Sequence, residues 1–146
     1  MNNTLCLLGG ITLLICGCGD AEISHVMGKV TYNGQPVTAG LVSFEPVEGG
    51  SLPYGISIHD GRYTSSSGSR IKPGKYIVRI TAPDLSRSNL DANAGPNDPV
   101  PPTVPLVPAS WNVQSKLSLD LRPGINEINF SGEKMTPPKV ERLDPQ

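Results

Sequence analysis

The chain has 146 residues, a formal net charge of −1 and 17% charged residues, and its lysines and arginines are scattered singly. Without a basic cluster, this composition argues against a nucleic-acid-binding protein. Its 16 glycines and 15 prolines lie between short segments of alternating apolar residues, a pattern typical of an all-β sandwich or barrel. No long segment has helical periodicity, so we expect almost no helix.

The N-terminus resembles a bacterial lipoprotein signal peptide. An apolar run at 5–15 leads into the residues LICGC at 14–18, with Gly17 directly before Cys18. The run is about 11 residues long, whereas about 20 are needed to span a bilayer, so it is typical of a signal peptide. We expect cleavage between Gly17 and Cys18 and fatty acyl chains such as palmitate on Cys18. Because residues 1–4 include no lysine or arginine, an ordinary signal peptide or a retained hydrophobic anchor stays an alternative.

This N-terminus predicts the location and the domain organisation. We expect a signal peptide at 1–17, a tether at 18–24, one β-sandwich domain at 25–131 and a disordered, Pro-rich tail at 132–146. The mature chain would keep no cysteine besides Cys18, so the core must stabilise the domain without a disulfide. The expected location is the periplasmic side of the cell envelope, held by the lipid. Gly19 after Cys18, in place of Asp, favours the outer membrane.

Alternating apolar residues predict a seven-stranded antiparallel Greek-key sandwich, prealbumin-like or Ig-like. Asn33-Gly34 suits a tight hairpin turn, and Pro46 ends a strand because proline has no N–H to donate. Turns are also expected at 59–62, 72–75 and 122–124. The strands are expected at 25–32, 41–45, 54–58, 63–65, 76–82, 117–121 and 128–130. The predicted core is Val26, Val30, Val42, Phe44, Ile56, Tyr76, Val78, Ile80, Leu119, Leu121, Ile128 and Phe130.

A long loop at 83–110 carries seven prolines and several Asn and Asp residues. Within it, Asn89, Asp91 and Asn93 alternate as at the start of a calcium loop, and calcium prefers such oxygen donors. The same residues are common in any solvated turn, and the closing Glu of a calcium loop is missing, since Val100 stands in its place. We therefore expect no cofactor apart from the covalent lipid and keep calcium as an alternative.

Aromatic residues suggest a second possible site. Trp111, Tyr54 and Tyr63 could together form a platform on which a sugar ring stacks. The alternative is that Trp111 fills the core beside the long loop.

Residues that could support catalysis are few. His25 and His59 are the only histidines, and Asp60 directly follows His59, so their side chains should point apart. No Gly-x-Ser-x-Gly motif, zinc-ligand cluster or phosphate-binding glycine loop is present in the sequence. We therefore expect no catalytic residues.

Three parts of the chain share a pattern: GKVTYNGQPV (28–37) with GLVSFEP (40–46), GRY (61–63) with IKPGKYIV (71–78), and VPASWN (107–112) with LDLRPGINEINF (119–130). Together they resemble the small transthyretin-like, carboxypeptidase-regulatory-like lipoproteins of planctomycetes. The chain departs from that family at Trp111, where tyrosine is usual. The resemblance implies a prealbumin-like sandwich and no established catalytic residues. A transthyretin-like enzyme that hydrolyses 5-hydroxyisourate depends on several histidines and a C-terminal Tyr-Arg-Gly-Ser, which the segment at 141–146 lacks.

These observations together predict a non-enzymatic, membrane-anchored lipoprotein of the bacterial cell envelope with a structural or binding role. Its expected partners are the membrane, through the lipid, and an envelope protein or glycan, but not nucleic acid. A carbohydrate- or peptidoglycan-binding module is one alternative. A hydrolase of the transthyretin-like class is another.

Overall fold

The computed structural model describes residues 22–48, 52–86, 104–133 and 137–143. These residues form an all-β fold with one short 3-10 helix, η1 (Ala109–Trp111), which confirms the predicted fold class. The strands are β1 (Ser24–Tyr32), β2 (Gln35–Pro36), β3 (Ala39–Pro46), β4 (Tyr54–His59), β5 (Arg62–Thr64), β6 (Gly74–Thr81), β7 (Ser118–Leu121), β8 (Gly124–Gly132) and β9 (Lys139–Leu143).

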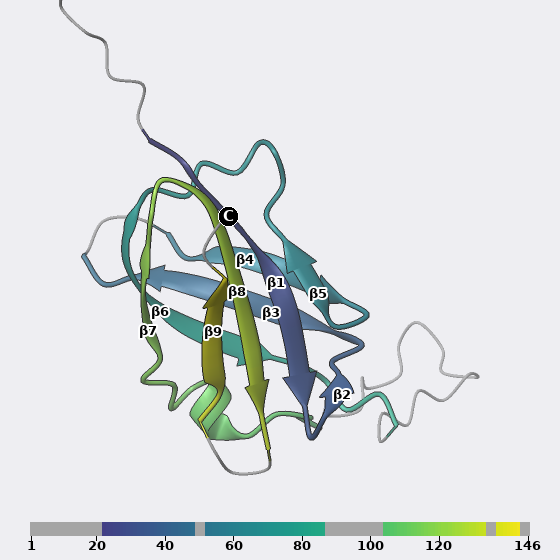
Figure 1. Ribbon diagram of the computed structural model, residues 1–146. Coiled ribbons are helices and arrows are strands. Elements are labelled where there is room, and N and C mark those ends of the chain that lie inside the picture. The colour runs from purple at the N-terminus through teal and green to yellow at the C-terminus, as the bar shows by residue number, and fades with distance from the viewer. Residues whose placement is uncertain (1–21, 49–51, 87–103, 134–136, 144–146) are drawn as a thin grey trace, which may run out of the picture.

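The strands form one curled sheet in the order β7-β6-β3-β4-β5-β1-β8-β9, with β2 paired to β1. In Figure 1, β1, β8 and β9 cross in front of β3, β4 and β6, so the curled sheet makes two layers. β4 belongs to the rear layer and its hairpin partner β5 lies beside β1, so the sheet passes from one layer to the other between these two strands.

The strand pairing differs from the expected antiparallel arrangement of seven strands. β1 and β8 are parallel, with partners from Ser24 and Gly124 to Tyr32 and Gly132, whereas the other strand pairs described are antiparallel. Both strands begin at the same end of the fold, where the Ser24 hydroxyl donates to Arg122 O at 2.8 Å. The sheet is therefore mixed, and it also contains the unexpected strands β2 and β9.

Strand β9 corrects the prediction of a disordered tail at 132–146. Residues Lys139–Leu143 pair antiparallel with β8, and Val140 packs against the core. The Arg142 guanidinium donates to the Asn126 side chain and to Asp120 O on β7, so it links the two edges of the sheet. A single inward apolar residue among charged ones is too weak a pattern to predict a strand.

Two hairpin turns have the conformation that their sequences favour. Asn33 and Gly34 have φ of 51° and 75°, and Asp60 and Gly61 have φ of 47° and 74°. Positive φ at both central residues defines the type I′ turn, whose twist matches the flanking strands. The predicted turn at Asn33-Gly34 is confirmed, and the second turn sets the β4–β5 hairpin described below.

The core contains the predicted inward residues, except that Leu119 is only half-buried. Residues from connecting segments complete the core, namely Val37, Ile71, Val107 and Trp111. The two described ends of the 83–110 loop are joined, because Leu106 N–H donates to Ala82 O and Asp84 N–H donates to Val104 O, both at 2.8 Å. This junction leads Val107 and Trp111 back into the core.

Glycine at position 28 is required by the contact between β1 and β8. A Cβ at Gly28 would lie 1.9 Å from the carbonyl oxygen of Ile128. We expect Gly28→Ala to push the two strands apart and to lower the free energy of unfolding by about 1–3 kcal/mol. Urea unfolding followed by the fluorescence of Trp111 measures this loss.

The matched control is Gly68→Ala, since a Cβ at Gly68 meets nothing within 4 Å. Its unfolding curve should stay close to that of the wild type. Equal stability of the two variants would contradict the tight packing of β1 against β8.

Candidate functional site

A polar groove lies where β4 and β5 separate. The two strands pair only at Ile58 with Tyr63 and at His59 with Arg62, next to their turn. Beyond these pairs β4 continues along β3, whereas β5 continues along β1. The opening that results has a volume of about 480 Å³. The groove is therefore built by the passage of the sheet from one layer to the other.

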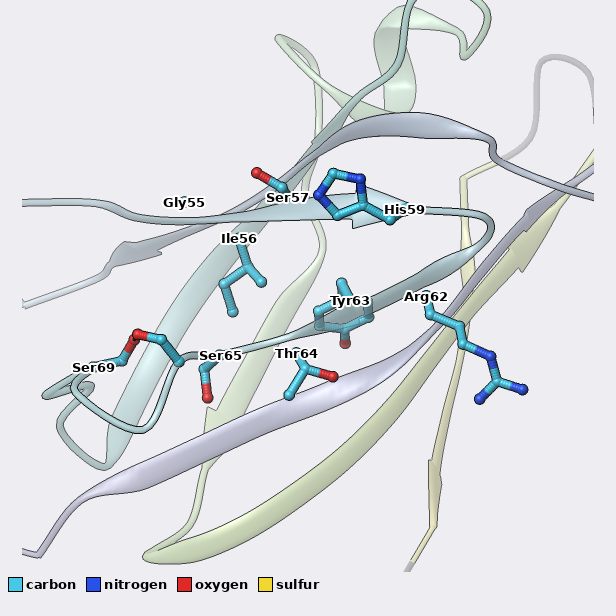
Figure 2. Close-up of a pocket in the computed structure, with 10 residues that line it drawn as sticks. Gly55, Ile56, Ser57, His59, Arg62, Tyr63, Thr64, Ser65 and Ser69 are labelled. Carbon is cyan, nitrogen blue, oxygen red and sulfur yellow. The ribbon is translucent and has the colours of Figure 1, made fainter.

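Outward-facing side chains of the two strands line this groove. Ser57 and His59 extend from β4, and Arg62 and Thr64 extend from β5 (Figure 2). They are exposed because alternate residues of a strand face opposite sides, while Ile58 and Tyr63 point into the core. Figure 2 also shows Ile56, Ser65 and Ser69 along the part of the groove farther from the turn.

The groove offers hydrogen-bond donors and a positive charge without an opposing carboxylate. Among the residues that the structure describes, no Asp or Glu lines it. Within the part of the chain that the structure describes, the side chains of Ser57, His59 and Arg62 make no hydrogen bond or ion pair, so they can contact a ligand. Ser66 and Ser69 bond each other through their hydroxyls at 2.9 Å. Ser65 is not available, because its buried hydroxyl accepts a bond from Val26 N–H at 3.0 Å.

This arrangement suits binding rather than nucleophilic catalysis. Ser57 and His59 share the outer face of β4 but no hydrogen bond joins them, and no carboxylate orients the imidazole. In the described ranges no group of three His, Cys, Asp or Glu side chains could hold a metal ion. A guanidinium among hydroxyls is instead complementary to an oxygen-rich ligand, above all one that carries a carboxylate or phosphate.

The predicted sugar-stacking platform is wrong. Trp111 is fully buried and meets Tyr32 edge-to-face at a ring distance of 5.6 Å. Tyr63 is buried and stacks on Phe130, and its hydroxyl donates to Ile128 O at 2.7 Å.

Tyr54, the third member of the predicted platform, is half-buried, and its hydroxyl donates to Arg70 O at 2.9 Å. The three rings thus lie in different places and stabilise the fold. Trp111 fills the core, as the alternative interpretation expected.

The remaining predicted sites fall outside the described residues. These are the lipidation and cleavage residues Gly17 and Cys18, and the calcium candidates Asn89, Asp91 and Asn93. His25 and His59 lie far apart in the sheet, on β1 and β4. The groove residues Arg62 and Thr64 were not anticipated. Alternation along 62–64 could have marked them as outward-facing, and the predicted turn at 59–62 could have placed them opposite 57–59.

Comparisons with known proteins add no family assignment. No protein-family model matches the chain, and no curated protein matches it either. Among the described residues, none of the helical structure is long and apolar enough to cross a membrane.

The buried tyrosine beneath the groove predicts a loss of stability at alkaline pH. Burial raises the pKa of Tyr63 far above its usual value of 10. The unfolded chain releases this proton near pH 10 while the folded protein retains it, so the contribution of Tyr63 to stability is constant below that pH and is lost as the pH rises further. In Tyr63→Phe we expect a smaller loss of stability above pH 10 than in the wild type. At pH 7 this variant should be about 1–3 kcal/mol less stable, because Ile128 O loses its hydrogen-bond donor.

Urea unfolding of both proteins between pH 7 and pH 11 measures the two effects. Since all other titrating groups are shared, the difference between the two curves reports Tyr63 alone. Parallel curves across the alkaline range would show that Tyr63 ionises normally in the folded protein.

Proposed function

We propose that the protein is a lipid-anchored module of the bacterial cell envelope that binds an oxygen-rich envelope glycan in the β4–β5 groove. The observation that carries this proposal is the lining of the groove, where Arg62 and His59 stand among hydroxyls and no described Asp or Glu belongs to the lining, although Asp60 lies in the turn between them. The anchor is inferred from Cys18 and the apolar segment before it.

The chemistry of the groove favours an acidic glycan over a neutral one. Hydroxyls such as Ser57 and Thr64 can exchange hydrogen bonds with sugar hydroxyls. The Arg62 guanidinium adds a charge-assisted, bidentate contact for a carboxylate or phosphate. Peptidoglycan and acidic polysaccharides combine these groups and lie within reach of a protein on the membrane surface.

The resemblance to transthyretin-like lipoproteins fits this proposal at the level of an all-β domain behind a lipid anchor. A hydrolase of the same class remains a separate prediction, and no described arrangement of side chains favours it. A panel of hydrolytic substrates with His59→Ala as control would test it.

The first prediction concerns the anchor. Purified from its native membrane, the mature protein should begin at Cys18 and carry the mass of three acyl chains. Two or more chains anchor a protein stably, whereas one chain gives only marginal binding. Cys18→Ser should abolish acylation and leave the precursor uncleaved, which intact mass spectrometry measures. A mature protein without acyl mass would contradict the anchor.

The second prediction concerns the groove. The soluble chain from Gly19 should be retained on isolated cell-wall or acidic polysaccharide fractions. Arg62→Gln should weaken this retention about tenfold, since a hydrogen bond to a charged group contributes about 1.5–3 kcal/mol. Co-sedimentation at increasing glycan concentration measures the change.

Lys116→Gln is the matched control, because it removes the same charge from an exposed site outside the groove. Its retention should equal that of the wild type. Equal weakening in both variants would indicate nonspecific charge attraction, and no retention of the wild type would refute glycan binding.

A further inference from the structure

Three exposed apolar side chains lie on one outer face at the start of β1 and β8. His25 pairs with Ile125, and Ile23 is held next to this pair because its carbonyl accepts a bond from Gly124 N–H at 2.9 Å. On β9, Leu143 pairs with Glu127, the next outward residue after Ile125. Ile23, Ile125 and Leu143 are 38%, 61% and 40% exposed. We call these three residues the apolar face.

The chain reaches this end of the fold directly from Cys18. Five residues lie between Cys18 and Ser24, the first residue of β1, so six residue-to-residue steps connect them. An extended chain spans at most about 3.3–3.6 Å per residue, so Ser24 can lie no more than about 20 Å from the lipidated cysteine. The same end of β1 therefore faces the membrane in an anchored protein. Figure 1 shows the chain entering β1 at the top of the molecule, opposite η1.

A connecting segment at this end adds basic and apolar side chains. Ser24 N–H donates to Ile71 O at 2.8 Å, so residues 70–75 lie beside the start of β1. This segment carries the exposed cations Arg70, Lys72 and Lys75 and no acidic residue.

The neighbouring segment around Val47 is joined to it by a bond from Val47 N–H to Lys75 O at 2.9 Å. Val47 and Leu52 are exposed there, Leu52 to 85%. Glu22, Glu48 and Asp120 lie at the same end, Glu127 lies on the apolar face opposite Leu143, and these carboxylates offset part of the positive charge. Apolar insertion must therefore contribute more to a membrane contact than charge.

We propose that the apolar face rests in the interfacial region of the bilayer that holds Cys18, with Lys72 and Lys75 beside anionic headgroups. This inference rests on the proposed lipid anchor. Exposed apolar side chains with cations at the same end of a domain are a combination that lipid interfaces attract. The contact fixes the orientation of the domain, so that η1 and the far ends of β1 and β8 point away from the membrane.

A depth measurement on the lipidated protein tests this orientation. Because Cys18 is the only cysteine of the mature chain and carries lipid, Ile125→Cys introduces a single free thiol for a fluorophore. The protein is reconstituted in phosphatidylcholine–phosphatidylglycerol vesicles that contain nitroxide-labelled lipid. We expect at least fivefold stronger quenching at position 125 than for the same label in Val113→Cys.

Val113 is a suitable control because it is 71% exposed and follows Trp111, which packs against Tyr32 and Gly132. Those two residues end β1 and β8, about 26 Å from their starts at about 3.3 Å per residue. Urea unfolding establishes that both labelled variants are folded. Equal quenching at positions 113 and 125 overturns the proposal.

Two further readouts separate this inference from the proposed function. Intact mass shows whether Cys18 is acylated, and absence of acyl chains refutes the anchor itself. An acylated protein that binds vesicles but shows equal quenching at both positions refutes only the orientation. A label at position 125 that is shielded from aqueous iodide yet unaffected by lipid nitroxide would show that protein covers the face, which also overturns the proposal.

Discussion

The parallel pairing of β1 with β8 is the constraint on which the rest of the structure depends. It joins segments about 100 residues apart along its full length, from Ser24 and Gly124 to Tyr32 and Gly132. Every later strand is placed relative to this pair, since β5 lies on one side of it and β9 on the other. The close approach of β1 to β8 at Gly28 and the bond from the Tyr63 hydroxyl on β5 to Ile128 O hold β5, β1 and β8 together.

A buried asparagine organises one end of this pair. Asn126 is almost fully buried, and its amide nitrogen donates to Arg122 O at 2.8 Å and Gly124 O at 3.2 Å. Its carbonyl oxygen accepts from Arg122 N–H at 3.0 Å and from the Arg142 guanidinium at 3.3 Å. One side chain thus satisfies the turn between β7 and β8 and holds β9, as a buried polar group must.

Structural features that depend on a local residue pattern were predicted from the sequence, whereas features that depend on pairing between distant segments were missed. Alternation along 76–80 and the Asn33-Gly34 turn are local signals, and the structure confirms both. The parallel register of β1 with β8 is a choice between partners that alternation does not specify. Strand β9 gains its stability from its position beside β8, since Val140 alone would not favour a strand.

The candidate site also combines features set by local sequence with features set by tertiary packing. Trp111 and Tyr63 are large aromatic residues that could stack on a ligand or fill a core, and only tertiary packing decides between these roles. The groove itself is a product of topology, because β4 and β5 pair at their turn and then follow β3 and β1 into different layers. The local β4–β5 hairpin brings Ser57 and His59 close to Arg62 and Thr64, whereas the opening between the two strands comes from the curl of the sheet. Residue spacing in the sequence does not encode that curl.

The position of β1 also determines how the domain would respond to mechanical force. In the proposed anchored protein, a pull on a glycan held at β5 reaches the membrane through β1, whose first residue follows the tether. β1 would be loaded along its axis, so its hydrogen bonds to β5 and β8 would be sheared together rather than opened one at a time. Rupture then requires several bonds to fail at once. In that arrangement the domain would transmit tension between a bound glycan and the lipid anchor without unfolding.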